Sequence, residues 1–272
     1  MRSHLGTIGP GIEATKLAEV RSVRGGTARG SVDPTVVEGP ARSKRKARRG
    51  PARPPVIIHW RDSKDSVREG VALRLLLVSD LHCDLDAAAS VVERSRGVDV
   101  VVGAGDFAVM RQGLAEIIDV LSVMDTPTIL VPGNGESAEE LAETCAAWTA
   151  ARVLHGSGVE VGGVPFFGLG GGVPVTPFGA WSFDLSEDEA RTLLARCPAR
   201  AVLVSHSPPK GHVDRDAMGR HLGSTAVLET VETARPRLVV CGHIHASWRE
   251  RSDAGASPII NAGPDGVVWD LV

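Results

Sequence analysis

From residue 71 onward, short apolar runs alternate with segments of helical period. Residues 74–82 (RLLLVSDLH) form a run without polar alternation, which is typical of a strand buried on both faces. Side chains alternate along a strand, so Asp80 and His82 at its end are expected to point the same way. The same order continues with strands predicted at 98–102 and 128–131 and helices at 85–94, 112–124 and 137–150. This order predicts a parallel sheet with helices on its faces.

The second half of the chain has a different pattern. Residues 153–169 predict short strands broken by Gly pairs, and a loop rich in Gly and Pro follows at 168–183. A helix is predicted at 186–196, and the remaining predicted strands are at 201–204, 238–241, 258–261 and 267–271. There is no internal repeat and no second core, so we expect one domain over residues 71–272.

The N-terminal segment has a different composition. Residues 1–55 are rich in Gly, Pro, Ser and Arg without a hydrophobic period, which predicts a disordered basic tail. Residues 1–70 hold 15 Lys/Arg against 7 Asp/Glu, whereas residues 71–272 hold 15 against 26. The basic cluster at 41–53 is either a patch for nucleic acid or another polyanion or a solvated tail, and we favour the tail. Residues 56–70 are a linker, with a possible edge strand at 56–60 (VIIHW).

Composition narrows the class of protein. The chain is 43% hydrophobic, enough for a substantial core, but no apolar run approaches the roughly 20 residues that cross a bilayer. We see no secretory signal, and the four cysteines have no CxxC spacing. These features predict a cytoplasmic protein with reduced thiols and no membrane partner.

Polar side chains with metal-binding chemistry follow most of the predicted strands. Carboxyl ends of strands in α/β sheets converge on one crevice, so residues far apart in sequence are expected to meet there. A set of oxygen and nitrogen ligands without thiolates suits Mn, Fe, Zn or Co, and its size suits two ions that share a carboxylate. The candidate ligands are Asp80, His82, Asp106, Asn134, His206, His243 and His245.

These residues stand in five motifs: Asp80-Leu-His82, Gly-Asp106, Gly-Asn134-Gly-Glu136, a lone His206, and Gly-His243-Ile-His245. In order and spacing the chain resembles the calcineurin-like metallophosphoesterases over residues 71–272. The resemblance implies a four-layer α/β/β/α sandwich with two mixed sheets.

The resemblance also implies a role for each motif residue. One metal ion would be held by Asp80, His82, Asp106 and His245, and a second by Asp106, Asn134, His206 and His243. Hydroxide between the two ions would attack phosphorus, with Asp106 and Asn134 as catalytic residues. Glu136 is expected to orient its loop rather than to bind metal.

The chain departs from the family pattern at Gly135. The family usually has a histidine there, close to the substrate, and glycine cannot protonate a leaving group. A weakly basic leaving group, as in some diesters and aryl esters, reduces the need for an acid. Alternatively His221 or His212 reaches the site from the polar segment after His206, and we favour His221 as the catalytic acid.

The sequence therefore predicts hydrolysis of a small-molecule phosphate ester, with diesters slightly favoured over monoesters. One alternative is a monoesterase that acts on nucleotides or phosphoproteins. The other is a non-catalytic protein that binds metal or polyanions on the same fold. Natural substrate, metal identity and oligomeric state are not determined by the sequence.

Overall fold

Two β-sheets form the centre of the protein, in a computed structural model that describes residues 58–59 and 73–272. These residues belong to one compact unit. The predicted tail at 1–55 and most of the linker at 56–70 lie outside the described residues. The strand predicted at 56–60 is present at its described positions, as β1.

The smaller sheet has the order β12-β2-β3-β4-β5, in which β2 to β5 are parallel and β12 is antiparallel to β2. Its strands are β2 (Leu73–Val78), β3 (Val100–Gly103), β4 (Thr128–Leu130), β5 (Ala151–Val153) and β12 (Val267–Leu271).

The larger sheet has the order β1-β6-β7-β8-β9-β11-β10. Strands β7, β8, β9 and β11 are parallel, β6 is antiparallel to β7 and β10 to β11, and both sheets are therefore mixed. Its strands are β1 (Ile58–His59), β6 (Ser157–Val161), β7 (Val164–Leu169), β8 (Val202–Ser205), β9 (Leu238–Cys241), β10 (Arg251–Ala254) and β11 (Ser257–Asn261).

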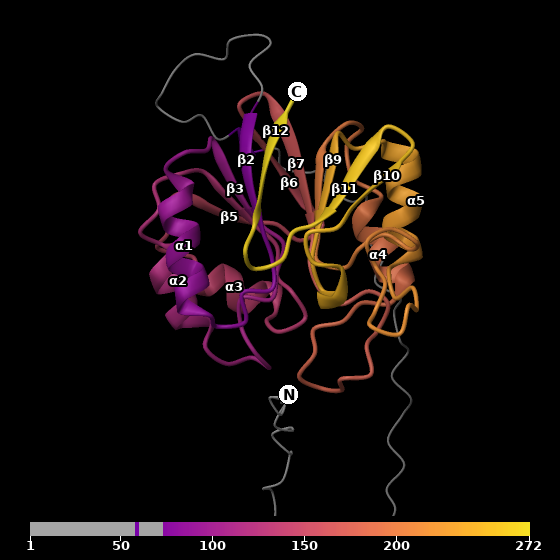
Figure 1. Cartoon of the computed structure of the whole chain (residues 1–272), viewed down its shortest axis with the longest axis horizontal. Coiled ribbons are helices and arrows are strands. Elements are labelled where there is room, and N and C mark those ends of the chain that lie inside the picture. Colours follow the sequence, from indigo (N-terminus) through magenta and orange to yellow (C-terminus); the bar gives the residue numbers. More distant parts are fainter. Residues whose placement is uncertain (1–57, 60–72) are drawn as a thin grey trace, which may run out of the picture. The chain divides into compact units, whose positions relative to one another are not determined.

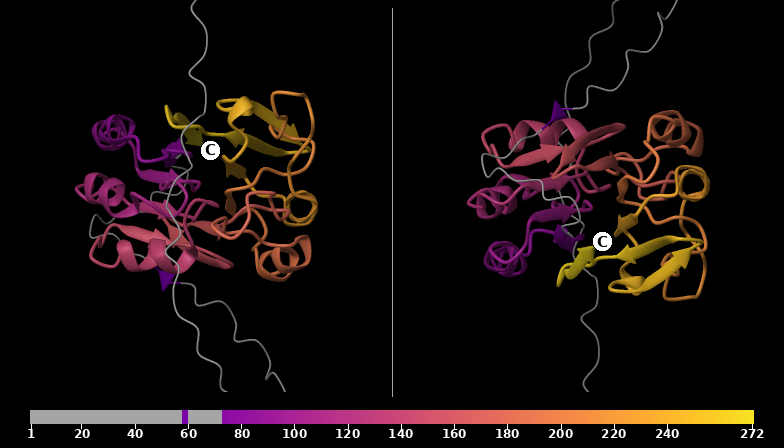
Figure 2. Two further views of the ribbon diagram at one scale, coloured as in Figure 1. Left: turned by 90° about the horizontal axis from the view of Figure 1, so that it is seen from below. Right: turned by 90° about the horizontal axis from the view of Figure 1, so that it is seen from above.

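Five α-helices of the described chain cover the outer faces of the sheets, and Figures 1 and 2 show the strands inside and the helices outside. Helices α1, α2 and α3 cover the smaller sheet, while α4 and α5 cover the larger one. This confirms the four-layer α/β/β/α sandwich. The helices are α1 (Leu85–Ser95), α2 (Leu114–Leu121), α3 (Ala138–Thr144), α4 (Glu187–Leu194) and α5 (Thr225–Ala234), with a 3-10 turn at His245–Ser247.

Three apolar clusters fill the three spaces between these layers, because successive side chains of each buried strand point to opposite faces. In β2, Leu75 and Leu77 pack into the cluster between the sheets. Leu76 and Val78 pack instead against the helices of the smaller sheet. The run of apolar residues without polar alternation is thus explained by burial on both faces.

The helices of the structure depart from the prediction in two main respects. The third helix was predicted to reach residue 150 but ends at Thr144, because Trp148 turns into the core and donates from Nε1 to the carbonyl of Met124 (3.0 Å). The chain then enters edge strand β5. Helix α5 was not predicted, although Ser224 caps it and Val227 and Val231 are buried at helical spacing. Its Thr and Val residues have weak helix propensity, so packing against the sheet decides its structure.

The parallel strands of both sheets end at the same edge of the molecule, at the bottom of Figure 1. Strands β2, β3, β4, β8 and β9 are each followed there by a turn or loop that carries predicted site residues.

Candidate metal centre

Asp80 and His82 lie in a tight turn after β2. The two side chains do converge on one cluster, as predicted, but the strand ends at Val78, so the turn rather than strand alternation brings them together. Both residues adopt left-handed backbone conformations, with φ of 55° and 44°. Their backbone N–H groups donate to the carbonyls of Gly105 and Asp106 (both 2.9 Å), so the turns after β2 and β3 are joined.

Asp106 follows β3 and is also left-handed, with φ of 57°. Its carboxylate is buried and accepts a hydrogen bond from the N–H of Gly135 (2.7 Å). A Cβ atom on Gly133 would lie 2.0 Å from Oδ1 of Asp106. The turn after β4 therefore needs glycine at 133 to approach the carboxylate this closely.

Glu136 joins the turns after β3 and β4 through hydrogen bonds. Its fully buried carboxylate accepts from the N–H groups of Phe107 (3.3 Å), Ala108 (2.9 Å) and Gly133 (2.7 Å). Burial, together with the negative charge of Asp106, raises the pKa of Glu136 to about 7, against the lowering effect of the N–H donors. Glu136 lies outside both candidate metal clusters described below, and its hydrogen bonds hold the two turns against each other.

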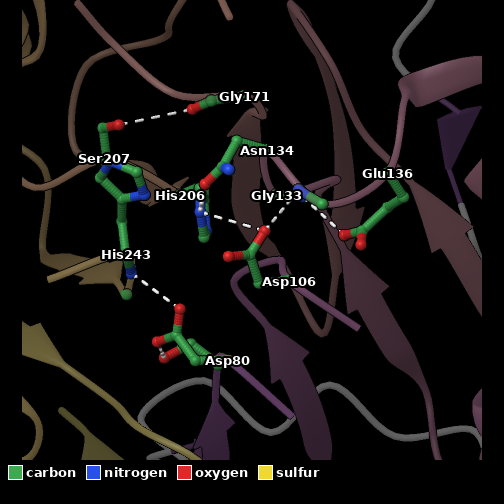
Figure 3. A network of polar contacts seen from close by, with 12 residues as sticks. Asp80, Asp106, Gly133, Asn134, Glu136, Gly171, His206, Ser207 and His243 are labelled. Carbon is green, nitrogen blue, oxygen red and sulfur yellow. Dashed lines mark hydrogen bonds and ion pairs between the residues drawn. The ribbon is translucent and has the colours of Figure 1, made fainter. Parts of the chain in front are cut away.

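Three histidines reach the same place from the larger sheet. His206, fully buried after β8, contacts the carbonyl of Ala104 through Nδ1 (2.8 Å), which directs Nε2 toward Oδ1 of Asn134 (3.2 Å). His243, left-handed with φ of 68°, donates its backbone N–H to Oδ1 of Asp80 (2.9 Å), and His245 follows in the same loop. Figure 3 shows Asp106 between the His206 ring and the turn after β4.

The predicted ligands form two clusters that share Asp106, and within each cluster one ligand atom of every residue lies within 4.8 Å of the others. Nε2 of His82 is 3.0 Å from Nε2 of His245 and 3.7 Å from Oδ2 of Asp106. Nε2 of His206 is 3.4 Å from Oδ1 of Asp106. The clusters are Asp80, His82, Asp106 and His245, and Asp106, His206 and His243, with the Asn134 amide oxygen beside His206.

The donor set fits divalent transition metals. Ring nitrogens and carboxylate oxygens converge without a thiolate, and the second ring nitrogens of His206 and His82 contact backbone carbonyls at 2.8 and 3.4 Å. Such outer contacts fix the orientation of metal-binding histidines. Burial opposes charge on Asp106, but the nearby His206 holds the pKa of that carboxyl below its usual value. Asp106 is therefore ionised, as a metal ligand must be.

Two contacts to Asp80 were missed by the sequence analysis. Its Oδ2 accepts from Nε1 of Trp248 (3.0 Å) and from the hydroxyl of Ser79 (2.6 Å). Trp248 lies far along the chain, and its only sequence signal is its position three residues after His245.

His221 belongs to neither cluster. It lies in the segment between β8 and α5, where Nδ1 contacts Oδ1 of Asp214 at 2.5 Å. Asp214 was not singled out from the sequence. At Gly135, a Cβ atom would lie 2.7 Å from the carbonyl oxygen of Ala108, so the backbone leaves no room for the histidine that the family usually has there.

A loop between β7 and α4 borders the second cluster. The N–H of Phe183 donates to the carbonyl of Asn134 (3.0 Å). In the same loop, half-exposed Phe178 stacks on Trp181 with ring centroids 5.5 Å apart and planes at 14°.

No helix in the described part of the chain is both long enough and apolar enough to cross a membrane.

Three known proteins are similar to parts of this chain. UPF0046 protein T07D4.2 of Caenorhabditis elegans is 37% identical over 86 residues, which are 30% of this chain and 21% of that protein. The chain thus spans about a fifth of the length of this curated relative. The crystal structure of TT1561 of Thermus thermophilus has the same fold, with a TM-score of 0.60 at 19% identity, covering 74% of this chain and 95% of that one. A dimetal phosphatase from Danio rerio matches with a TM-score of 0.47 at 13% identity over 70% of this chain and 87% of that one.

The sequence profile of the calcineurin-like phosphoesterase superfamily domain matches residues 73–268. This range contains both sheets except β1 and the last residues of β12, and it includes every residue of the two clusters. The chain belongs to the calcineurin-like phosphoesterase superfamily.

Proposed function

We propose that this protein hydrolyses a phosphate ester with two divalent metal ions. The observation that carries the proposal is the position of Asp106, whose two carboxylate oxygens face different histidines. Oδ2 lies 3.7 Å from Nε2 of His82, and Oδ1 lies 3.4 Å from Nε2 of His206. A carboxylate placed in this way suits a ligand shared by two ions.

Each ion has its own set of residues in this proposal. Asp80, His82, Asp106 and His245 hold the first, and Asp106, Asn134, His206 and His243 hold the second. The oxygen and nitrogen donors accept Mn, Fe, Zn or Co. When bound, the ions would activate water and offset the negative charge that develops on the phosphoryl oxygens.

The chain's own residues supply rigid placement. Ser79 and Trp248 both donate to Oδ2 of Asp80, so this carboxylate has one orientation. The carbonyl of Ala104 does the same for the ring of His206. Fixed ligands keep the reacting groups in position without reorganisation during the reaction, which is the main contribution a protein makes to this chemistry.

The proposed substrate is a small-molecule phosphate ester, with diesters favoured over monoesters. Support comes from the turn after β4, where Gly135 provides no acid and the Ala108 carbonyl leaves no space for one. The same proposal includes a cytoplasmic setting, in which the free thiols of the four cysteines remain reduced.

Hydrolysis of chromogenic esters tests the proposal. We expect the purified protein with Mn²⁺ to release p-nitrophenol from bis-p-nitrophenyl phosphate faster than from p-nitrophenyl phosphate. The reverse order would favour a monoesterase. No release from either ester would instead favour a binding protein without turnover.

A matched pair of variants tests the role of the shared carboxylate. We expect Asp106→Asn to lose bound metal, measured by elemental analysis, and to lose activity together with it. Asp119→Asn, which removes an exposed carboxylate from α2, serves as the control and is expected to keep both. An Asp106→Asn variant that retains two metal equivalents would contradict the proposed ligand set.

A further inference from the structure

A histidine and a buried carboxylate form a pair in the segment between β8 and α5. Nδ1 of His221 lies 2.5 Å from Oδ1 of Asp214, whose side chain is fully buried. The other oxygen of Asp214 accepts from the N–H groups of Gly211 (3.0 Å) and Gly223 (2.9 Å). Burial opposes ionisation, but the hydrogen bond with His221 and those from Gly211 and Gly223 together outweigh it and lower the pKa of Asp214. An ionised carboxylate can only accept, so Nδ1 of His221 is the donor and Nε2 remains for another partner.

One side of this pair is attached to the loop that carries His243. The side-chain amide of Asn261 donates to the carbonyl of Val213, next to Asp214, at 3.4 Å. The same nitrogen lies 3.2 and 3.1 Å from the carbonyls of Gly242 and Ile244, which flank His243. A single buried amide therefore joins the backbone beside Asp214 to the backbone on both sides of His243.

The other side of the pair is attached to the turn that carries His245. Arg215, which follows Asp214, accepts at its carbonyl from the hydroxyl of Ser247 (3.1 Å), and Ser247 closes the 3-10 turn that begins at His245. Arg215 is thus bonded directly to the turn that begins at His245. Val213 is linked to the backbone beside His243 through the side chain of Asn261. The segment that carries the pair is therefore bonded to both parts of the loop that holds His243 and His245.

The ring of His221 is held but accessible. Its backbone pairs with Arg215 in an isolated antiparallel bridge, and its carbonyl accepts from Nζ of Lys210 (2.7 Å). Its side chain is 36% exposed. The backbone and Nδ1 are therefore fixed while part of the ring faces solvent. The other histidine of this segment differs, because His212 contacts the hydroxyl of Ser252 (3.1 Å) rather than a carboxylate.

We propose that His221 is the catalytic residue that gives a proton to the leaving oxygen, and that Asp214 is its positioning residue. This inference rests on the proposed phosphoesterase function. It accounts for Gly135, since the acid would come from the loop after β8 rather than from the turn after β4. A histidine oriented by a carboxylate through one ring nitrogen is a recurrent arrangement for proton transfer at the other.

The step balances without a further reactant. Water forms the new bond to phosphorus, and the bond between phosphorus and the leaving oxygen breaks with its electron pair on that oxygen. The doubly protonated ring of His221 gives its Nε2 proton to the leaving oxygen, which departs as an alcohol or phenol, and keeps its Nδ1 proton on the side of Asp214. The proton released by the attacking water restores the donor through solvent, and Asp214 keeps its charge throughout.

The test uses p-nitrophenyl, phenyl and methyl diesters, whose leaving groups become more basic in that order. General acid catalysis contributes about 100-fold or more where the leaving group is poor. We therefore expect His221→Gln to lower kcat by about 100-fold on the methyl ester and to leave the p-nitrophenyl ester nearly unchanged. Asp214→Asn is expected to lower kcat in the same order across the three esters, by smaller factors. The reason is that an amide at 214 can hold the His221 ring in the wrong tautomer.

Matched controls come from the same segment. His212→Gln removes a histidine without a carboxylate partner, and Asp216→Asn removes a carboxylate that pairs with Arg220 at the surface. Both are expected to show no dependence on the leaving group. Thermal melts and bound metal are measured for every variant, so that loss of fold is separated from loss of the proton donor.

Two results would overturn the inference. Equal rates of His221→Gln and wild type on all three esters would remove His221 from the reaction. An equal loss on all three esters, with altered metal content, would assign the pair a structural role only. Failure of the proposed function has a different signature, because the wild-type protein itself would then hydrolyse none of the esters.

Discussion

The two sheets contribute to the metal centre in different ways. The smaller sheet supplies its ligands within four residues of a strand end, in turns joined to one another by backbone hydrogen bonds. These ligands are Asp80, His82, Asp106 and Asn134. The larger sheet supplies histidines together with long segments, one before α4 and one before α5.

The comparison assigns metal binding to the short turns and substrate contact to the long loops. Short turns fixed by buried carboxylates suit metal binding, which needs one geometry. Long loops suit contact with the substrate, because their sequences can change without disturbing the sheet. Changes in the turns should therefore affect metal content, and changes in the loops should affect substrate use.

The largest effect is expected from Gly133→Ala in the turn after β4. The new methyl group would lie 2.0 Å from Oδ1 and 2.1 Å from the backbone nitrogen of Asp106. We expect loss of bound metal and a cost of about 1–3 kcal/mol in the free energy of unfolding, typical of overpacking. Gly97→Ala is the control, since its methyl group would meet only the Arg94 carbonyl at 3.7 Å. Equal metal content in the two variants would refute the close approach.

A smaller effect is expected from Gly135→His, which restores the residue that the family usually has. Its Cβ would press on the carbonyl of Ala108, and that carbonyl contacts Nδ1 of His82 (3.4 Å). We expect metal affinity to fall about tenfold, as for other outer contacts of metal-binding histidines, with no gain on monoesters. Gly135→Ala carries the same Cβ without the ring and should lose similar affinity. Faster monoester hydrolysis by Gly135→His alone would show that the backbone adapts.

Glu187, at the start of α4 on the larger sheet, offers a test that depends on pH. Burial raises its pKa, but hydrogen bonds from Ala226, Thr225 and Ser224 at the start of α5 outweigh this and lower it below 4.5. A lowered folded-state pKa adds stability above the unfolded value, and this stability is lost as pH falls through the folded value.

Glu187→Gln should therefore unfold about 1 kcal/mol more easily than wild type at pH 7, as for a lost helix cap, and this deficit should shrink at pH 3 as the wild-type Glu187 takes up a proton. Urea denaturation at the two pH values measures this, with exposed Glu232→Gln as the control. Metal content and activity at pH 7 should not change. A deficit that persists at pH 3 would mean that packing, rather than charge, is lost.

The smallest effect is expected at the tip of the loop before α4. Phe178 stacks on Trp181, and Phe183 two residues later anchors the loop to the carbonyl of Asn134. Phe178→Ala should raise KM for bis-p-nitrophenyl phosphate about threefold through loss of an aromatic contact, while kcat and bound metal stay constant. Val123→Ala, which shortens another exposed apolar side chain, should change nothing. An unchanged KM would show that Phe178 does not contact the substrate.

The ligand positions were predictable because they depend on local pattern. Each buried strand has a recognisable apolar run, and parallel strand ends must meet at one edge, so Asp80, Asp106 and His206 could be placed together without coordinates. The family motifs added the assignment to two ions.

The supports of the site were not predictable. The contact between Trp248 and Asp80 joins residues 168 apart in sequence, and the partner of His221 is one of the two acids in its segment, Asp214 and Asp216. The end of α3 depends on the burial of Trp148, which outweighs the helix propensity of the alanines around it. Such features follow from three-dimensional packing, which single-sequence patterns do not contain.

The left-handed backbone at Asp80, His82, Asp106 and His243 has a consequence for the history of this chain. Each such conformation costs about 1–3 kcal/mol for a residue other than glycine, and the cost is tolerated where a side chain is needed for function. A descendant released from selection for metal binding should therefore accumulate glycine or asparagine at these four positions and become more stable as it loses activity.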